Sequence, residues 1–382
     1  MSAGAPWLVV AGDFVRTGGM DAANHALAAH LAASGREAHL AAHRVDPELA
    51  ALAGVTVHRV PRPLGSHLLG FPLLDRAGRR WAARLAARGV RVLANGGNCR
   101  AGGATWLHYV HAAYRPEIAG RPLRRGIESL ARRRALRDER VAVARAGVVI
   151  ANSRLTARHA VELLGAAPER VHTVYYGADP ERFRPPADAD RAAARARLGI
   201  RDGAPALAFV GALGDRRKGF DTLFAAFGQL CGRPGWDATL LVAGAGGELE
   251  RWRRRAAAAG LGERIRFLGF RRDVREVLHA CDGVVAPARY EAYGLAVQEA
   301  LCLGLPAVVS RGAGVAERIP AALGGLLLDR PDDADELGAR LLAWREGLAE
   351  HRAAALACGA ELRAWSWERM AARIVDIVEE RG

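Results

Sequence analysis

The chain has 382 residues, of which 51% are hydrophobic, 25% charged and 6% aromatic, and its formal net charge is +14. This length and composition predict two globular domains, each with its own core, and exclude a low-complexity chain. The five cysteines are odd in number and include no CxxC pair, so neither a disulfide framework nor a zinc site is expected.

The basic charge favours acidic ligands such as nucleotides, phosphate esters or anionic lipid headgroups. Nucleic-acid binding is not expected, because no recognition motif accompanies the charge. No uninterrupted apolar run reaches the length of about 18 residues that a membrane span needs. The early segment "PWLVVAGDF" is interpreted as a first strand and not as a signal peptide. We therefore expect a cytoplasmic protein.

Short apolar runs that predict β-strands alternate with longer Ala-, Leu- and Arg-rich segments of helical period. Such alternation is typical of parallel sheets covered by helices on both faces. In the first half of the chain, the expected strands are residues 7–12, 37–43, 55–60, 90–95, 105–110, 147–152 and 170–176. In the second half, they are residues 206–211, 239–244, 264–269, 283–288, 306–310 and 324–328.

The alternation breaks at "GADPERFRPPADAD", where three prolines and several acids prevent a regular element. We therefore predict a first doubly wound domain at residues 1–178, a linker at 179–190 and a second doubly wound domain at 191–364. Residues 365–382 contain an amphipathic helix, which we expect to pack back on the first domain. In such folds, ligands bind beyond the carboxyl ends of the strands.

Residues 286–310 are the most informative segment. A loop carries Glu291, a tight turn is expected at Gly294, and a helix then runs through Glu299. The backbone N–H groups of Gly294 and Leu295, at the start of that helix, suit a phosphate. A carboxylate one turn inside the helix suits the two hydroxyls of a ribose, and Glu291 suits a sugar beyond the phosphates. Taken alone, the two glutamates are better explained as solvated surface residues.

The spacing from Glu291 to Glu299, followed by Gly304 and Pro306, resembles the E-x7-E segment of the retaining glycosyltransferases of family 4, which have the GT-B fold. The resemblance extends over roughly the whole chain and is weaker before residue 148. The other segments that carry it, in the family's order, are residues 148–185, 209–227, 240–256, 264–294 and 310–319. It implies an α/β architecture of two Rossmann-like domains that face a central cleft, with the nucleotide sugar held by the second domain and the acceptor by the first.

Lys218 is the only lysine among the 55 Lys and Arg residues, and it falls on the basic position of the family's second-domain motif. The resemblance implies that its ammonium contacts the diphosphate of the donor. Negative charge grows on the departing phosphate, so a pre-placed cation stabilises the transition state more than the ground state. An ammonium is also a compact point charge, whereas a guanidinium is a broad planar fork.

A second cation is missing from its usual place. Members of the family often have arginine directly after the strand's glycine, but here Gly211 is followed by Ala212. We expect Arg216 to supply this charge in preference to Arg217, although either can equally be a solvated loop residue.

Two features of the first domain are candidates for ligand contact. Gly18 and Gly19 lie between a strand and a helix, where the backbone can approach a ligand closely. The resemblance implies contact with donor phosphate or acceptor, whereas a double glycine alone is often only a turn. His111 follows an expected strand, where the family tends to place a histidine near the transferred sugar, and a neutral imidazole can bind a sugar hydroxyl. His108 is expected to be structural.

Four further segments have charged or glycine-rich motifs. Residues 119–147 are densely basic and suit an acidic acceptor, an anionic membrane surface or a solvated helix. The acidic motifs at 188–190 and 332–335 are interpreted as helix-capping residues and not as metal ligands. In "AGAGGE" and the residue after it, Leu249 occupies the place of the third glycine of a dinucleotide fingerprint. Neither a metal nor a nicotinamide cofactor is expected.

The resemblance implies a retaining, metal-independent hexosyltransferase that moves a sugar from a nucleotide sugar, expected to be UDP-linked, to a hydroxyl acceptor in envelope polysaccharide or glycolipid assembly. The catalytic candidates are Lys218, Glu291 and His111, and the donor-binding candidates are Glu299, Gly294, Leu295, Arg216, Gly18 and Gly19. Peripheral contact with the inner face of an anionic membrane is one option. Three alternatives remain open, namely a glycosyltransferase of small-molecule natural products, a sugar-nucleotide epimerase of the same fold and, on charge alone, a nucleic-acid-binding protein.

Overall fold

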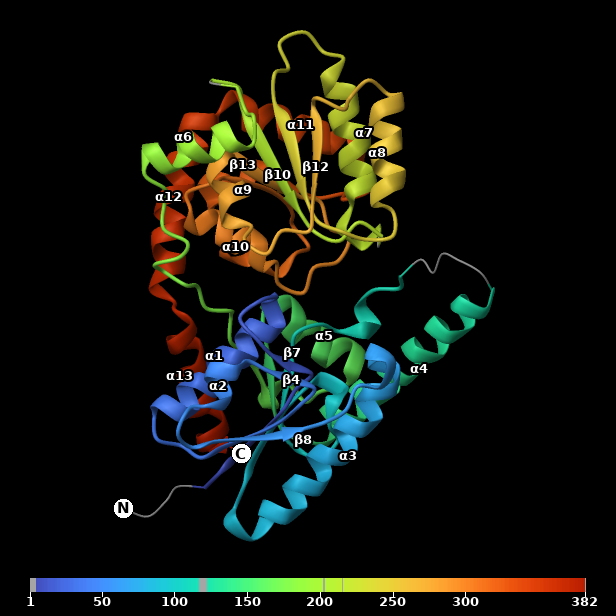
Figure 1. The fold of residues 1–382 in the computed structure, drawn as a ribbon, viewed down its shortest axis with the longest axis vertical. Helices are drawn as coiled ribbons and strands as arrows, with labels where there is room; N and C mark the ends of the chain where they lie inside the picture. The colour runs from blue at the N-terminus through green and yellow to red at the C-terminus, as the bar shows by residue number, and fades with distance from the viewer. Residues whose placement is uncertain (1–4, 117–121, 202, 215, 382) are drawn as a thin grey trace. The chain divides into compact units, whose positions relative to one another are not determined.

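The computed structural model describes residues 5–116, 122–201, 203–214 and 216–381. The chain forms two compact units, and their elements are labelled in Figure 1. Unit 1 is Met1–Gly177 together with Trp367–Gly382, and unit 2 is Ala178–Ser366.

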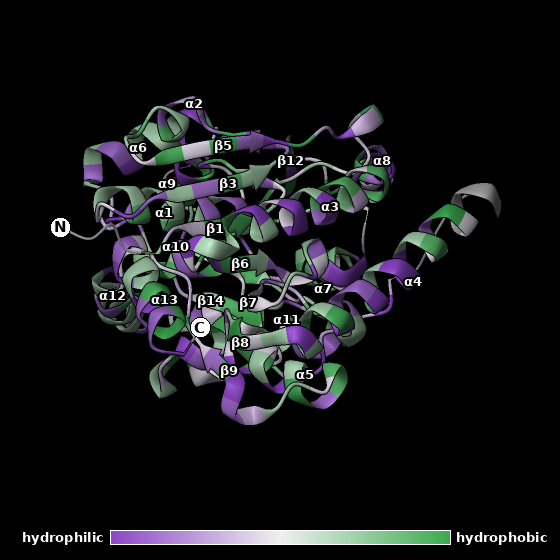
Figure 2. Cartoon of the chain, turned by 90° about the horizontal axis from the view of Figure 1, so that it is seen from below, coloured by the Kyte–Doolittle hydropathy of each residue, from purple (hydrophilic) through white to green (hydrophobic). Residues whose placement is uncertain are grey.

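Unit 1 is built on a sheet that, within the described residues, has seven parallel strands in the order β5-β3-β1-β6-β7-β8-β9. Figure 2 shows this order across the sheet. The interior strand β1 is wholly buried, as a parallel strand covered on both faces requires. The strands are β1 (Trp7–Val10), β3 (Ala38–Ala42), β5 (Val55–Arg59), β6 (Arg91–Asn95), β7 (Gly103–Leu107), β8 (Ala146–Ala151) and β9 (Val171–Thr173), and the short strands β2 (Asp13–Phe14) and β4 (Arg44–Val45) pair separately.

The helices of unit 1 include one from the far end of the chain. That helix, α13, packs against α1, where its buried side chains Met370, Ile374 and Val378 face inward. Arg36 also donates two hydrogen bonds of 2.9 Å to the carboxylate of Glu379. The helices are α1 (Gly19–Ala33), α2 (Pro47–Ala50), α3 (His67–Leu85), α4 (Pro122–Arg145), α5 (Arg154–Leu164) and α13 (Trp367–Arg381), with 3-10 turns η1 (Pro63–Gly65), η2 (Ala86–Arg88), η3 (Gly96–Asn98), η4 (His111–Ala113) and η5 (Pro168–Arg170).

Unit 2 is built on a second parallel sheet with the order β12-β11-β10-β13-β14-β15 in the described part of the chain. Its core includes the fully buried Phe227 and Trp344. The strands are β10 (Ala206–Val210), β11 (Thr239–Ala243), β12 (Ile265–Gly269), β13 (Gly283–Ala286), β14 (Ala307–Ser310) and β15 (Leu327–Leu328). The helices are α6 (Asp188–Arg197), α7 (Phe220–Cys231), α8 (Leu249–Ala258), α9 (Arg275–Ala280), α10 (Leu295–Cys302), α11 (Ala334–Glu346) and α12 (Leu348–Ala364), with 3-10 turns η6 (Arg216–Lys218), η7 (Gly314–Arg318) and η8 (Ala321–Leu326).

The expected α/β fold with two doubly wound sheets is confirmed, and each sheet grows outward in both directions from its first long strand, β1 or β10. The last expected strand is shorter than predicted, because η8 occupies residues 321–326 and leaves only β15. The segment expected as a linker lies in unit 2, where Phe183 is buried in the core and α6 begins at Asp188.

One of the acidic motifs caps a helix as predicted. Asp333 accepts hydrogen bonds of 3.0 Å from the backbone N–H groups of Asp335 and Glu336 at the start of α11. Asp188 and Asp190 lie in the first turn of α6, where negative charge complements the helix dipole.

Candidate functional site

Lys218 and Glu291 form an ion pair in unit 2, with the Lys218 ammonium donating to Oε2 of Glu291. Both side chains are mostly buried, with 23% and 21% of their surface exposed. Arg217 lies beside them, because its Nη1 is 3.8 Å from the same carboxylate and 3.1 Å from the Tyr290 carbonyl oxygen, to which it donates. The structure therefore brings two of the predicted catalytic residues together with a second cation.

Gly219 positions Lys218 against the end of β13. Its φ is +70°, and a Cβ there would lie 1.9 Å from the carbonyl oxygen of Pro287. Only glycine allows the two backbones to approach this closely. The η6 turn, which carries Lys218, is thereby held against the chain that leads to Glu291.

The loop with Glu291 is fixed by backbone and side-chain contacts. Gly294 has a φ of +112° and is the N-cap of α10. Tyr293 donates to the side-chain oxygen of Gln298 in a buried pair, and the Tyr293 carbonyl accepts from the N–H of Val315 at 2.7 Å. Since Leu295 is the first residue of α10, the positive end of the helix dipole and its first backbone N–H groups follow Glu291 directly.

Glu299 lies one turn further along α10. Burial raises the pKa of its carboxyl to about 8, while the positive charge of Arg182 opposes this effect and the negative charge of Asp273 adds to it. A protonated carboxyl donates as well as accepts hydrogen bonds, which suits a pair of hydroxyls.

Arg216 binds an acidic side chain of α7. Its Nε and Nη2 are 2.9 and 2.8 Å from Oδ2 of Asp221 in α7, and Arg289 donates to both oxygens of the same carboxylate. Burial alone would raise the pKa of Asp221, but the hydrogen bonds from Arg289 and Arg216 lower it below its ordinary value. Arg217 is thus the arginine that lies beside Glu291, and the expectation that Arg216 supplies the second cation stays a prediction.

His111 in unit 1 begins η4, directly after the loop that follows β7. Its Nδ1 is 3.0 Å from Oε1 of Glu139, and its backbone N–H donates to Oε2 of the same carboxylate at 3.1 Å. Glu139 is only 1% exposed, whereas the His111 side chain is 45% exposed. An acceptor at Nδ1 favours the tautomer that carries its proton there and leaves Nε2 as an acceptor.

His108 packs against the rings of Trp106 and Tyr176, and it also lines a pocket of unit 1. Its Nδ1 is 2.5 Å from the hydroxyl of Tyr176. Burial lowers the pKa of the imidazole to about 3, so the ring is neutral at pH 7.

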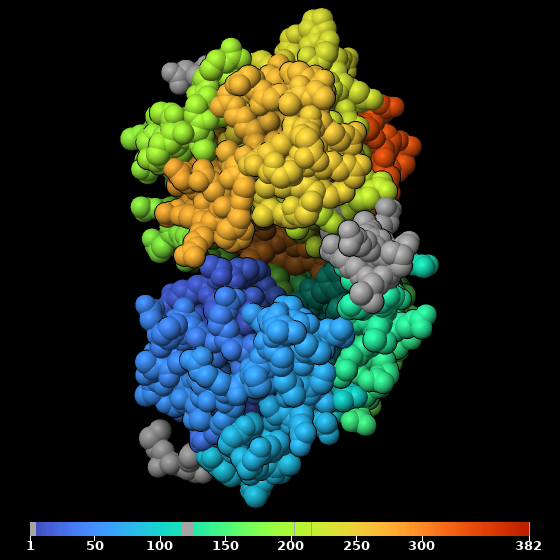
Figure 3. All heavy atoms as spheres, turned by 45° about the vertical axis from the view of Figure 1, so that its right-hand side comes forward, coloured from blue at the N-terminus to red at the C-terminus, as the bar shows by residue number. Residues whose placement is uncertain are grey.

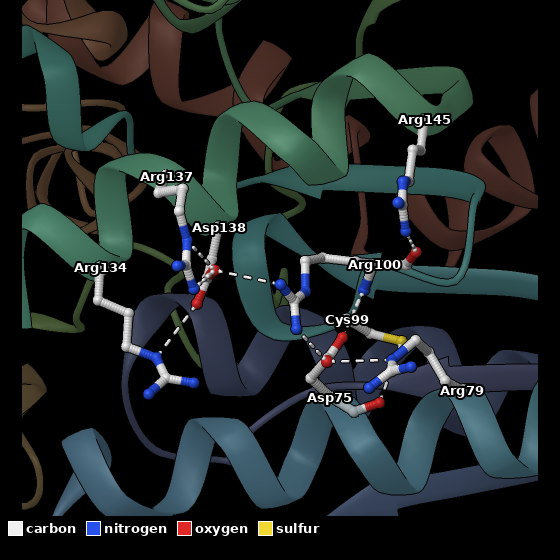
Figure 4. A network of polar contacts seen from close by, with 8 residues as sticks. All are labelled: Asp75, Arg79, Cys99, Arg100, Arg134, Arg137, Asp138 and Arg145. Atoms are coloured by element: carbon white, nitrogen blue, oxygen red, sulfur yellow. Dashed lines mark hydrogen bonds and ion pairs between the residues drawn. The ribbon is translucent and has the colours of Figure 1, made fainter.

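A network of charges holds the helix that carries Glu139 (Figure 4). Arg100 donates to Asp75 of α3 at 2.7 Å and lies 3.6 Å from Asp138 of α4. Arg134 and Arg137 also contact Asp138. These contacts join α3 and α4, and so fix the helix position that precedes Glu139.

A pocket of about 590 Å³ lies in unit 1, and both His111 and Glu139 line it. Gly18, with a φ of +87°, and Gly19 open α1, and the next two residues, Met20 and Asp21, also line the pocket. Burial and then the charge of Asp13 raise the pKa of Asp21 to about 6, against the opposing charges of two arginines.

The sequence interpretation missed Glu139, Asp13 and Asn95, all of which line this pocket. Glu139 stands beside Asp138 in an otherwise basic segment and before the apolar residues 141–143, a change of character that could have indicated a buried acid. Within the described ranges, no group of three or more His, Cys, Asp or Glu side chains is placed to hold a metal ion. In the same residues, no helix combines the length and the apolar character that crossing a bilayer requires.

Comparison with known proteins places both units in known families. The family model described as "Glycosyltransferase Family 4" matches residues 17–182, and the model described as "Glycosyl transferases group 1" matches residues 190–355. With the two doubly wound sheets, these matches define the GT-B class of glycosyltransferase folds. The chain belongs to glycosyltransferase family 4.

Two curated relatives are named D-inositol 3-phosphate glycosyltransferase. The relative from Nocardia farcinica is 35% identical over 62% of this chain and 53% of its own length. The relative from Saccharomonospora viridis is 36% identical over 65% of this chain and 59% of its own length. A Corynebacterium glutamicum relative, named as a GDP-mannose-dependent mannosyltransferase of a monoacylated phosphatidylinositol monomannoside, is 32% identical over 59% and 60%. The chain thus spans little more than half the length of these relatives.

Solved structures share the fold at lower identity. Sucrose-phosphate synthase from Thermosynechococcus elongatus superimposes with a TM-score of 0.77 at 20% identity, over 98% of both chains. The Anabaena protein HepE in complex with UDP and glucose gives a TM-score of 0.73 at 20% identity, over 98% of this chain and 99% of its own.

Proposed function

We propose that the protein is a retaining, metal-independent glycosyltransferase that moves a sugar from a nucleotide sugar to a hydroxyl group of an acceptor. The observation that carries this proposal is the Lys218–Glu291 ion pair beside the start of α10 in a family 4 chain. The pair brings an ammonium and a carboxylate together just before α10, where the proposed donor would exchange their mutual contact for contacts with its diphosphate and its sugar.

In the proposed reaction, the bond between C1 of the sugar and the diphosphate oxygen breaks, and the acceptor oxygen bonds to C1 on the same face. The acceptor's hydroxyl proton passes to the departing phosphate oxygen, so no protein nucleophile is needed. Lys218, with the N–H groups of Gly294 and Leu295, stabilises the charge on the leaving phosphate. Arg217, which lies 3.8 Å from Glu291, supplies the second positive charge.

Glu291 binds the transferred sugar and Glu299 binds the ribose in unit 2, while His111 binds a sugar hydroxyl in unit 1. Nε2 of His111 accepts a hydrogen bond from a sugar hydroxyl because Glu139 holds the proton on Nδ1. Gly18 and Gly19 bring the α1 N-terminus to donor phosphate or acceptor, with unit 1 binding the acceptor. The donor nucleotide proposed is UDP, and GDP is the competitor to test, because one relative is named as GDP-mannose-dependent.

The acceptor belongs to envelope polysaccharide or glycolipid assembly in the cytoplasm, and small-molecule natural products are the second candidate. A specific observation supports contact with an anionic membrane surface. Ile127 and Leu130 on α4 are 50% and 63% exposed, and arginines follow them on the same helix.

The test is incubation of the full chain with UDP- and GDP-sugars, with EDTA present, followed by mass spectrometry of the released nucleotide. Hydrolysis of a UDP-sugar that EDTA does not slow supports the proposal. Dependence on an added divalent metal would contradict metal independence. Interconversion of sugar epimers, without release of the sugar from its nucleotide, would favour the epimerase alternative. The anomeric configuration of a transfer product, measured by NMR, tests retention.

A further inference from the structure

The pocket of unit 1 has an apolar side formed by Met20 and by Leu68 and Phe71 of α3. Met20 and Phe71 remain 41% and 36% exposed, although both side chains are large and apolar. Figure 3 shows α3, in light blue, as part of the surface of unit 1. Exposed apolar side chains that gather at a pocket indicate contact with an apolar part of a ligand.

The polar side of the pocket includes Asp13 and Asn95, which are 7% and 4% exposed. Within the described ranges, Oδ1 of Asp13 and Oδ1 of Asn95 are buried and have no hydrogen-bond partner. The orientation of the Asn95 amide is fixed, because its Nδ2 donates to Oδ1 of Asn24 at 2.8 Å and Asn24 donates to the Asp13 carbonyl at 3.1 Å. Two buried acceptor atoms thus lack a donor.

The charged groups of the pocket do not suit a phosphate. Arg132 donates to the carbonyl oxygens of His111 and Tyr114, and Arg134 donates to Asp138 at 3.3 Å. The carboxylate of Glu139 adds negative charge, and so does that of Asp21 once it is ionised, while Asp13 is balanced by Arg44 at 3.0 Å and Arg62 at 3.6 Å. A ligand that donates hydrogen bonds and carries no negative charge complements this arrangement.

We propose that this pocket binds a neutral glycoside as the acceptor. Sugar hydroxyls donate to Oδ1 of Asp13 and Oδ1 of Asn95, while an apolar aglycone packs against Met20 and Phe71. This inference rests on the proposed function, because it assigns the acceptor of that transfer. It also distinguishes the chain from relatives whose names specify a phosphorylated inositol.

The test is calorimetric titration of the full chain with phenyl β-D-glucopyranoside, D-glucose and D-inositol 3-phosphate. The phenyl glucoside is expected to bind at least tenfold more tightly than either other probe. Phe71→Ala is expected to weaken that binding about tenfold. Leu69→Ala is the matched control, because Leu69 is 45% exposed on the same helix but does not line the pocket, and it should leave binding unchanged.

Asp13→Asn should also weaken phenyl glucoside binding. If loss of the Asp13–Arg44 ion pair unfolds the Asp13→Asn variant, the Phe71→Ala variant still tests the proposal. Tightest binding by D-inositol 3-phosphate, no binding of the phenyl glucoside, or no effect of Phe71→Ala would each overturn the inference. Hydrolysis of a UDP-sugar by the same samples separates the two proposals. Hydrolysis without glycoside binding overturns only the acceptor assignment, whereas glycoside binding without hydrolysis of any nucleotide sugar counts against the transferase itself.

Discussion

Lys218 and Glu291 are separated by 73 positions in the sequence, yet their side chains form an ion pair in unit 2. The lysine comes from the turn after β10, and the glutamate comes from the loop after β13, which neighbours β10 in the sheet. Because parallel neighbouring strands end at the same edge, residues from two distant motifs meet there. The first prediction follows from this pair.

Replacing Lys218 by arginine is expected to lower kcat for sugar transfer about 10²- to 10³-fold, because a planar guanidinium cannot occupy the place of a compact ammonium beside the leaving phosphate. Steady-state rates of nucleotide release measure this effect. Arg233→Lys is the control, because it exchanges arginine and lysine at an exposed position, and it should not alter the rate of nucleotide release. Activity close to that of the unchanged protein in Lys218→Arg would remove the proposed role.

Glu139→Gln is expected to lower kcat about tenfold, or about 1.4 kcal/mol, because the amide no longer selects the His111 tautomer. His111→Asn should cause a similar loss. If Glu139 acts through His111, the double variant should be little worse than either single variant, and the measured coupling should be roughly 1 kcal/mol or more. Additive losses would show instead that Glu139 acts on kcat independently of His111. Arg140→Gln, at an exposed position next along the helix, is the control.

Gly219→Ala is expected to destabilise unit 2 by about 3 kcal/mol, because the new Cβ would have to lie 1.9 Å from the Pro287 oxygen at a positive φ. Gly235→Ala separates these two causes. Gly235 also has a positive φ, of +82°, but a Cβ there meets nothing within 4 Å, so the expected loss is only roughly 1 to 2 kcal/mol. Urea unfolding curves measure both variants, and equal losses would contradict the prediction.

Glu299 should make the stability of unit 2 depend on pH. Its pKa is raised from an ordinary 4.5 to about 8, so the folded protein holds a proton that the unfolded chain releases. The contribution of Glu299 to stability is therefore complete below pH 4.5 and is lost as the pH rises through about 8. Glu299→Gln removes this dependence, so the variant should gain stability relative to the unchanged protein between pH 5 and pH 9. Urea unfolding at the two pH values measures the difference, and a constant difference would contradict the assignment.

The fold could be predicted because its strands are short apolar runs bounded by polar or glycine-rich loops, as β10 and β13 illustrate. The sequence also indicated Lys218 and Glu291, through their place in recognised motifs. It favoured Arg216 over Arg217 but gave no sign that Arg216 would bind Asp221, because that contact depends on how the next helix packs. Glu139 was missed for a related reason. Its burial comes from the packing of α4 and not from the basic composition around it.

The placement of α13 has a consequence for biosynthesis. A ribosome makes all the strands of unit 1 first, then the whole of unit 2, and only afterwards α13, the helix that packs on α1. Until Met370, Ile374 and Val378 have been synthesised, the apolar surface of unit 1 that α13 covers is exposed. All residues of unit 2 have been synthesised by then. Unit 2 is therefore complete before unit 1, although its translation starts later. Ribosome-bound chains that stop before residue 367 should recruit chaperones.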